Sequence, residues 1–285
     1  MKSALPVLAI LASVAADSPP RDAALPARVD LGPEMARLGL SARAQGNRDT
    51  CSLFAVTALA SFEAGRPSPA PAKQLSEEFL IWAANEATGL GGDQAMFYEA
   101  VHGLNTLGIC TEDRMPYANR PRRGSRPSMD ALSEARALSE RWKVHWIKRW
   151  DVKTPLSDAQ MVEIKQALAN GHLVACGLRW PKSLRGSRIL EVPSPEGVYD
   201  GHSIAFTGYQ DDPERGGEGE WLFRNSAGGE WGNRGEGALS YAYARAYVNV
   251  ALWLELGPPL SEKPTTRIEA EAMPLLAHER CEASP

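Results

Sequence analysis

Hydrophobic residues in the first half of the chain recur at the spacing of an α-helix. Over residues 51–64, Phe54, Ala58 and Phe62 lie four residues apart, which places them on one helix face. Gly65 and Pro67 then end the pattern. Similar patterns predict helices over 75–87, 94–107, 129–141 and 158–169, with Ser76 as the expected cap of the first and a Ser157–Gln160 capping box at the last.

Apolar and polar residues alternate in the second half. Trp142, Val144 and Trp146 alternate with Lys143 and His145, which predicts a half-buried strand with a basic outer face. Aromatic residues among basic ones also occur on single-strand nucleic-acid surfaces, but the rest of the chain is not basic enough to favour that interpretation. Apolar runs predict further strands over 173–178, 202–209, 220–223 and 247–255.

This order, helices first and strands second, indicates an α+β fold rather than alternating βαβ units. We expect a domain over 28–256, with a helical lobe over about 47–127 and a strand-rich lobe over about 128–256. The basic Pro/Gly loop at 118–128 is the expected junction. A linker is expected over 17–27, and a loosely held tail over 257–285.

Composition removes several classes of protein. The 285 residues are 44% hydrophobic and 23% charged, which excludes a wholly disordered chain, a collagen and a coiled coil. The formal net charge of -4 argues against a nucleic-acid partner. Four cysteines are too few for a disulfide-stapled scaffold.

The N-terminus reads as a targeting signal. Lys2 is followed by an uncharged apolar run that ends in small residues at Ala16, and the polar sequence DSPPRD comes next. This arrangement is typical of a secretory signal peptide over 1–16, and a buried first helix is the less favoured alternative. The run is too short to span a bilayer. We therefore expect a secreted or periplasmic protein without a membrane span.

Four polar residues have the types and order of a thiol-based catalytic site. Cys51 opens a predicted helix, where the helix dipole favours a thiolate, although a lone cysteine is more often a core residue. Gln45, six residues upstream, could donate to an oxyanion together with the Cys51 N–H. His202 and Asn225 follow in predicted strand regions and could serve as base and orienting partner. A cysteine paired with such a histidine is expected to have a pKa well below its ordinary value.

The order and separations of Gln45, Cys51, His202 and Asn225 resemble the papain-like cysteine peptidases. Neighbouring motifs extend this resemblance from about residue 29 to about residue 256. They are Gln45-Gly46, Leu75-Ser76-Glu77, Gly91-Gly92, Gly108 to Tyr117, His202 to Tyr209 and Asn225 to Gly232.

The resemblance implies a two-lobed α+β fold, with Cys51 on the helical lobe and with His202 and Asn225 on an antiparallel β lobe. It implies hydrolysis of peptide bonds through a thioester acyl-enzyme, with a peptide or protein as substrate and with no metal or other cofactor. Gly91 and Gly92 are then expected to bind the backbone of the substrate.

Several positions depart from the family pattern. Arg48 stands where the family has a disulfide cysteine, Ser52 where it has an aromatic residue, and Ala227 where an indole shields the His–Asn hydrogen bond. Trp231 is the surviving indole of that motif and is expected to help with the shielding. Only 34 residues separate the expected signal from Cys51, too few for the family's long pro-region. These changes resemble the divergent bacterial members of the family.

Two other functions use the same residues. One is an acyl transferase or amidase, and the other is a catalytically weak peptide-binding module, which the changes at Ser52 and Ala227 suggest and the retained polar set argues against. The remaining histidines lack metal-ligand spacing, and of the remaining cysteines two are expected to be buried free thiols. The histidines are His102, His145, His172 and His278. The expected buried thiols are Cys110 and Cys176, and the third remaining cysteine is Cys281.

Overall fold

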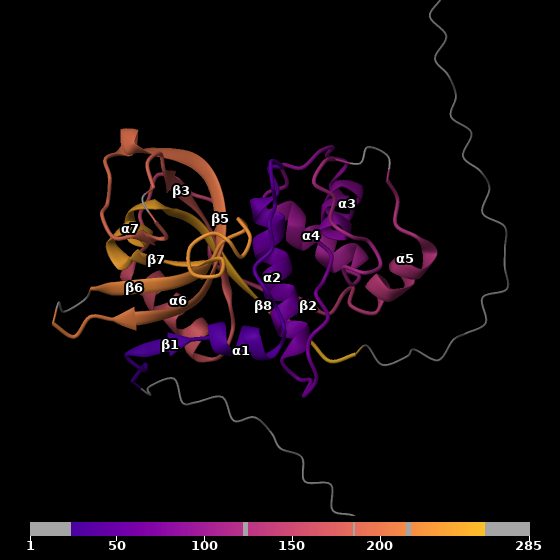
Figure 1. Cartoon of the computed structure of the whole chain (residues 1–285), viewed down its shortest axis with the longest axis horizontal. Helices are drawn as coiled ribbons and strands as arrows, with labels where there is room; N and C mark the ends of the chain where they lie inside the picture. Colours follow the sequence, from indigo (N-terminus) through magenta and orange to yellow (C-terminus); the bar gives the residue numbers. More distant parts are fainter. Residues whose placement is uncertain (1–23, 122–124, 185, 215–217, 260–285) are drawn as a thin grey trace, which may run out of the picture.

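The computed structural model describes residues 24–121, 125–184, 186–214 and 218–259. The expected signal peptide, most of the expected linker, Cys281 and nearly all of the expected tail lie outside these residues. Figure 1 shows the architecture, with α2 to α5 gathered on one side and most strands on the other, where α6 and α7 also lie. This arrangement is the expected α+β fold of two lobes.

The helical side is built from α2 (Cys51–Gly65), α3 (Glu77–Thr88), α4 (Phe97–Leu107) and α5 (Met129–Arg136). Ser76 caps α3 by accepting a hydrogen bond from the Phe79 N–H, as its position before the helix predicts. The central helix, α2, is buried along almost its whole length. It packs on the sheet as well as on α3 and α4, so it joins the two halves of the molecule.

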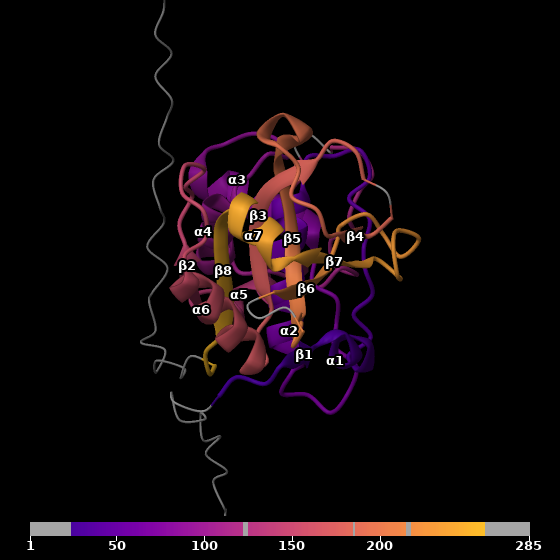
Figure 2. The ribbon, with the colours of Figure 1, turned by 90° about the vertical axis from the view of Figure 1, so that its left-hand side faces the viewer.

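Within the described residues the sheet has eight strands, of which seven follow the spatial order β2-β8-β3-β5-β6-β7-β4 while β1 pairs with β5. Neighbouring strands are antiparallel except for β4 and β7, which are parallel. Figure 2 shows α6 and α7 on the face of the sheet that points away from the helical side. The strands are β1 (Arg28–Asp30), β2 (Trp142–Lys148), β3 (Val174–Pro181), β4 (Arg188–Ile189), β5 (Val198–Asp211), β6 (Gly219–Arg224), β7 (Glu236–Ser240) and β8 (Val248–Leu256). The remaining helices are α1 (Gly32–Arg37), α6 (Asp158–Ala169), α7 (Tyr241–Tyr247) and a 3₁₀ turn over Pro195–Gly197.

The central strands contribute side chains to a packed core on each face of the sheet, because successive side chains alternate between the two faces. In β5, Ala205 belongs to the core that contains α2, whereas Ile204 and Phe206 belong to the core on the opposite face. The strand therefore reads as a continuous apolar run rather than an alternating one. Its first half lies over the start of α2, which places residues near His202 beside Cys51.

Several expected elements keep their type but change their bounds. The helix expected over 129–141 ends at Arg136, and α4 begins at Phe97 rather than at residue 94. The strand expected from Tyr247 begins at Val248, because Tyr247 closes the short helix α7. α5 contacts α4, so it packs with the helical side although the sequence placed residue 128 at the start of the other lobe.

No helix among the described residues is long and apolar enough to cross a membrane.

Candidate active site

Cys51 is the first residue of α2, and a set of hydrogen bonds fixes the turn that precedes it. The side chain of Thr50 lies 2.9 Å from the Tyr117 hydroxyl, which in turn donates to the Gln45 carbonyl at 2.8 Å. Thr50 is fully buried, whereas Cys51 is partly exposed. The thiol thus sits at the surface end of a rigid helix start, where a substrate can reach it.

His202 lies on β5 and is paired with Asn225, the residue that follows β6. Nε2 of His202 donates to Oδ1 of Asn225 at 2.8 Å, and the same oxygen accepts from the Ser226 N–H at 2.8 Å. Asn225 is buried. A bulge in β5 precedes His202, with Gly201 at a φ of 96°, a conformation that favours glycine. Because Nε2 carries the proton, Nδ1 is the nitrogen that can accept one.

Burial opposes charge on both the thiol and the imidazole. Desolvation raises the pKa of Cys51, although hydrogen bonds from Ser203 and from the backbone N–H of Ser52 work in the opposite direction. Desolvation lowers the pKa of His202, against the hydrogen bond to Asn225. Both net shifts favour the neutral forms. The thiol pKa is therefore raised here, and the lowered value expected from the helix start is wrong for this resting state.

Gln45 connects the two halves of the site. Its Oε1 accepts a hydrogen bond from the Ser226 hydroxyl, its Nε2 donates to the Arg48 carbonyl at 2.7 Å, and its backbone N–H donates to the Ser226 carbonyl at 2.8 Å. The amide is thereby held in one orientation, and the second N–H of Nε2 stays available for a further acceptor. Gln45 and Asn225 both contact Ser226, Asn225 pairs with His202, and Ser203, next to His202, hydrogen-bonds the Cys51 thiol, so the structure brings the four predicted polar residues into one region.

Gly91 and Gly92 lie in the exposed loop after α3. Both residues border a surface groove together with Asn47 and Asp49, which lie in the turn before α2. The Gly92 carbonyl accepts from Nδ2 of Asn85 at 2.8 Å. A Cβ atom at either glycine would meet nothing within 4 Å, so the space beside this backbone is open.

Arg48 holds the loop that contains Gly91 and Gly92 through ion pairs and hydrogen bonds rather than through a disulfide. Its guanidinium binds both Asp93 oxygens at 2.8 Å, contacts Glu78 at the start of α3 and donates to the Ala118 carbonyl at 2.6 Å. The ring of Tyr117 lies 4.8 Å from the guanidinium carbon. Burial lowers the pKa of Arg48, but Asp93 and Glu78 raise it by more, so the charge is kept. The arginine ties three segments around the groove.

The aromatic neighbour of the imidazole is Trp180, which the sequence did not single out. The rings of Trp180 and His202 are edge-on with centroids 4.4 Å apart. The ring of Trp231 lies tilted against Phe223 with centroids 5.8 Å apart, and Phe223 meets Trp180 at 6.0 Å. Among the described ring contacts, Trp231 is linked to His202 through Phe223 and Trp180, and its expected shielding role stays a prediction.

Sequence reasoning also passed over three residues that support the set. Ser203 faces the thiol, Ser226 bridges Gln45 to Asn225, and Tyr117 fixes the turn before Cys51. Ser203 and Ser226 are direct neighbours of predicted residues, which is the signal that could have found them. Cys110 and Cys176 are buried free thiols as expected. Within the described residues no group of three or more His, Cys, Asp or Glu side chains could hold a metal ion.

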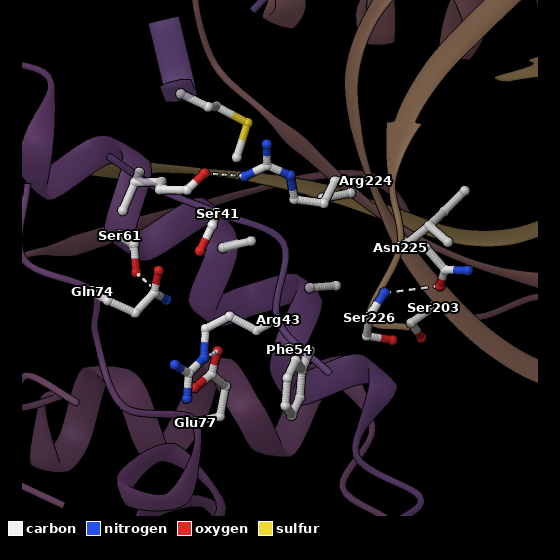
Figure 3. Close-up of a pocket in the computed structure, with 16 residues that line it drawn as sticks. Ser41, Arg43, Phe54, Ser61, Gln74, Glu77, Ser203, Arg224, Asn225 and Ser226 are labelled. Carbon is white, nitrogen blue, oxygen red and sulfur yellow. Dashed lines mark hydrogen bonds and ion pairs between the residues drawn. The ribbon is translucent and has the colours of Figure 1, made fainter. Parts of the chain in front are cut away.

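A small cavity with polar and apolar lining lies behind the site, between α2, the middle of β5 and the end of β6. Figure 3 shows Ser203, Asn225 and Ser226 on one side of it and the paired Arg43 and Glu77 on the other. Nε of Arg43 lies 3.0 Å from Oε1 of Glu77. Desolvation raises the pKa of Glu77 to about 7 although Arg43 lowers it. The cavity therefore contains a carboxyl group that changes charge near neutral pH.

Glu77 should make the fold less stable as the pH rises. Its ordinary pKa is 4.5 and its folded pKa is about 7, so in this window the folded chain holds a proton that the unfolded chain has released. By linkage, the Glu77 contribution falls by about 3 kcal/mol between pH 4.5 and pH 8. Urea unfolding at both pH values should show that Glu77→Gln removes most of this loss. The exposed Glu163→Gln on α6 serves as control, and equal pH dependence in Glu77→Gln and the parent would contradict the assignment.

Comparisons with known proteins agree with the two-lobed fold. The family model described as papain family cysteine protease matches residues 25–247. Among solved structures, xylellain, a cysteine protease from Xylella fastidiosa, is similar with 22% identity and a TM-score of 0.68, over 89% of this chain and 95% of that one. The digestive procathepsin L 3 of Tenebrio molitor larval midgut is similar with 18% identity and a TM-score of 0.59, over 83% of this chain and 72% of that one. A comparison with curated proteins finds no match.

Proposed function

The chain belongs to the papain family of cysteine proteases, and we propose that this cysteine peptidase cleaves peptide bonds with Cys51 as nucleophile, His202 as base and Asn225 as the residue that orients it. The observation that carries this proposal is the 2.8 Å hydrogen bond from Nε2 of His202 to Asn225, next to a partly exposed cysteine at a helix start. A nucleophile, a base and a group that fixes the tautomer of the base are the three parts that thiol catalysis needs.

The reaction proceeds through two acyl transfers. Sγ of Cys51 attacks the substrate carbonyl while its proton passes to Nδ1 of His202, and a carbon–sulfur bond forms. The carbon–nitrogen bond then breaks, His202 returns the proton to the leaving amine, and a thioester remains on Cys51. Water, deprotonated by His202, attacks that thioester, the carbon–sulfur bond breaks, and the acid is released while His202 returns its proton to Sγ of Cys51. Asn225 keeps Nδ1 turned toward the thiol at every step.

The negative oxygen of each tetrahedral intermediate requires donors in fixed positions. We assign this role to the free N–H of Gln45 Nε2 and to the backbone N–H of Cys51. Ser226 and the Arg48 carbonyl hold the Gln45 amide in place, so little reorganisation is needed when charge develops. Removing one such donor from a comparable site costs about 100-fold or more in turnover.

The groove beside Gly91 and Gly92 is the proposed site for the substrate backbone. The two residues offer N–H and C=O groups without side chains that would block an extended peptide. The proposal includes export through the signal peptide at 1–16, after which the chain would begin near Asp17. It includes no cofactor.

Labelling with iodoacetamide against pH tests the assignment of His202. Burial raises the pKa of the Cys51 thiol, so the thiol needs an acceptor for its proton to react at low pH. We expect Cys51 to be labelled at pH 6 about tenfold faster, or more, in the parent than in His202→Ala. Because burial lowers the pKa of His202, the imidazole stays neutral below its ordinary range, and kcat/KM should fall only below about pH 6.5.

The other cysteines provide an internal control for this experiment. Desolvation raises the pKa of Cys110 to about 12 and raises that of the fully buried Cys176. Both should be labelled slowly in both proteins, as peptide mapping would show. Equal rates for Cys51 in the parent and in His202→Ala would exclude His202 as the base.

A further inference from the structure

An indole expected near the His–Asn pair is missing from its place in the Asn motif. Ala227, two residues after Asn225, is exposed and carries only a methyl group. It pairs with Ala44 in an isolated bridge, so backbone rather than an aromatic ring passes this point. Trp231, the next tryptophan in the motif, contacts Phe223. Neither residue supplies the ring that lies against His202.

Trp180 fills this role from a different element. It lies near the end of β3, opposite Tyr199 of β5, beyond the bulge that precedes His202. Its ring is edge-on to the imidazole at 4.4 Å and also edge-on to Phe223 at 6.0 Å. The side chain is 7% exposed, so the sheet holds it in place. Since the bulge adds one residue to β5, Trp180 and His202 come together although Leu178 is the strand partner of His202.

We propose that Trp180 is a positioning residue that has taken over the shielding of the His202–Asn225 hydrogen bond. The proposal rests on the catalytic set proposed above. A hydrogen bond is stronger where water is excluded, and an aromatic edge against one side of the imidazole also restricts its rotation. Trp180 therefore acts through His202, not on the substrate. It would help to keep Nδ1 aimed at Cys51 during both proton transfers.

Charged neighbours do not account for the lowered pKa of His202, which has desolvation as its main cause. Charged residues near His202 on the same two strands are Arg179 and Asp200, which pair with each other at 2.7 Å, with side chains 29% and 66% exposed. Tyr199 is half exposed and its pKa is raised by burial and by Cys51. Cys51 faces Ser203. Among the ring contacts of the described residues, the ring of Trp180 is the one that lies against the imidazole.

The test removes the indole at position 180 and, in a double variant, introduces one at position 227, where the family resemblance places it. We expect Trp180→Ala to lower kcat about tenfold, the value of one buried hydrogen bond, with KM changed by less than about threefold. The acid limb of kcat/KM should shift toward higher pH, since a solvated imidazole regains its ordinary pKa. The double variant Trp180→Ala/Ala227→Trp should recover part of both effects. Trp180→Phe should retain most of the activity.

Each outcome is separable from a failure of folding or of the catalytic assignment. Circular dichroism and thermal melts verify that the variants are folded. Trp231→Ala serves as a control with a smaller expected loss of kcat, because its ring is linked to the His202 imidazole only through two other rings. A folded Trp180→Ala protein with unchanged kcat and unchanged acid limb would overturn the shielding role. So would a loss as large in Trp231→Ala as in Trp180→Ala. Activity that survives Cys51→Ala would instead overturn the proposed function.

Discussion

Cys51→Ala is expected to abolish peptide hydrolysis while the protein remains folded. The change removes the sulfur that forms the thioester, so the proposed reaction loses its first bond. Removing the nucleophile of a comparable hydrolase costs about 10⁶-fold in turnover. Alanine favours the helix that begins at this position, and the cysteine side chain is partly exposed, so the fold loses little. Release of product from a fluorogenic peptide measures the effect.

Two companion measurements make this result specific. An activated ester substrate mixed with the parent should leave an acyl group on Cys51 that intact-protein mass spectrometry detects, and Cys51→Ala should carry none. Cys110→Ala is the matched control, because Cys110 is a fully buried free thiol with no part in the proposed reaction, and it should keep parental turnover. Hydrolysis by Cys51→Ala at a rate near that of the parent would refute the thiol mechanism.

The site depends on contacts between the two lobes rather than on either lobe alone. Cys51 and Gln45 come with the helical side, and His202 and Asn225 come with the sheet. The segments meet where Ala44 pairs with Ala227 and where Gln45 exchanges hydrogen bonds with Ser226. A small relative shift of the lobes would separate Cys51 from His202, so these bridges fix the geometry on which the proposed reaction depends.

The sequence predicted the main helices well because their local signals agree with their tertiary contacts. The Ser157–Gln160 capping box begins α6 as expected, and α2 begins at Cys51. Short elements were not predicted. β4 has two residues and β1 has three, too few for a pattern to develop, and α7 was not predicted, its last residue, Tyr247, being placed in the strand that follows. Their positions are fixed by neighbouring strands, not by local spacing.

The proximity of Gln45, His202 and Asn225 could be predicted because the types, order and separations of these residues carry information without coordinates, and their catalytic roles stay a prediction. The contact between Trp180 and His202 could not be predicted, because it arises from a bulge between two paired strands. The direction of the thiol pKa also failed as a prediction. A helix start favours the thiolate, but desolvation in the assembled cleft is larger, and burial at an interface between lobes is not visible in a local sequence.

Arg48 illustrates how one substitution can replace a covalent constraint. The family resemblance places a disulfide cysteine at this position, and here the arginine reaches Asp93, Glu78 and the Ala118 carbonyl from a nearly buried position. The cysteines at 51, 110 and 176 are free. Because this link contains no sulfur, a reducing agent should leave it intact. It holds the loop with Gly91 and Gly92 against the turn that carries Gln45.

Arg48→Ala should therefore destabilise the protein more than most single changes, by about 3–5 kcal/mol, since it leaves the carboxylates of Glu78 and Asp93 without their partner. The stability of Arg48→Lys should lie between that of the parent and that of Arg48→Ala, because an ammonium cannot bind both Asp93 oxygens in a planar fork. Urea unfolding followed by circular dichroism, with and without dithiothreitol, measures both. Arg245→Ala is the matched control, since its pair with Asp158 is exposed and should contribute no more than about 1 kcal/mol. If Arg48→Ala lost no more than this control, the ionic network would not be what holds the loop.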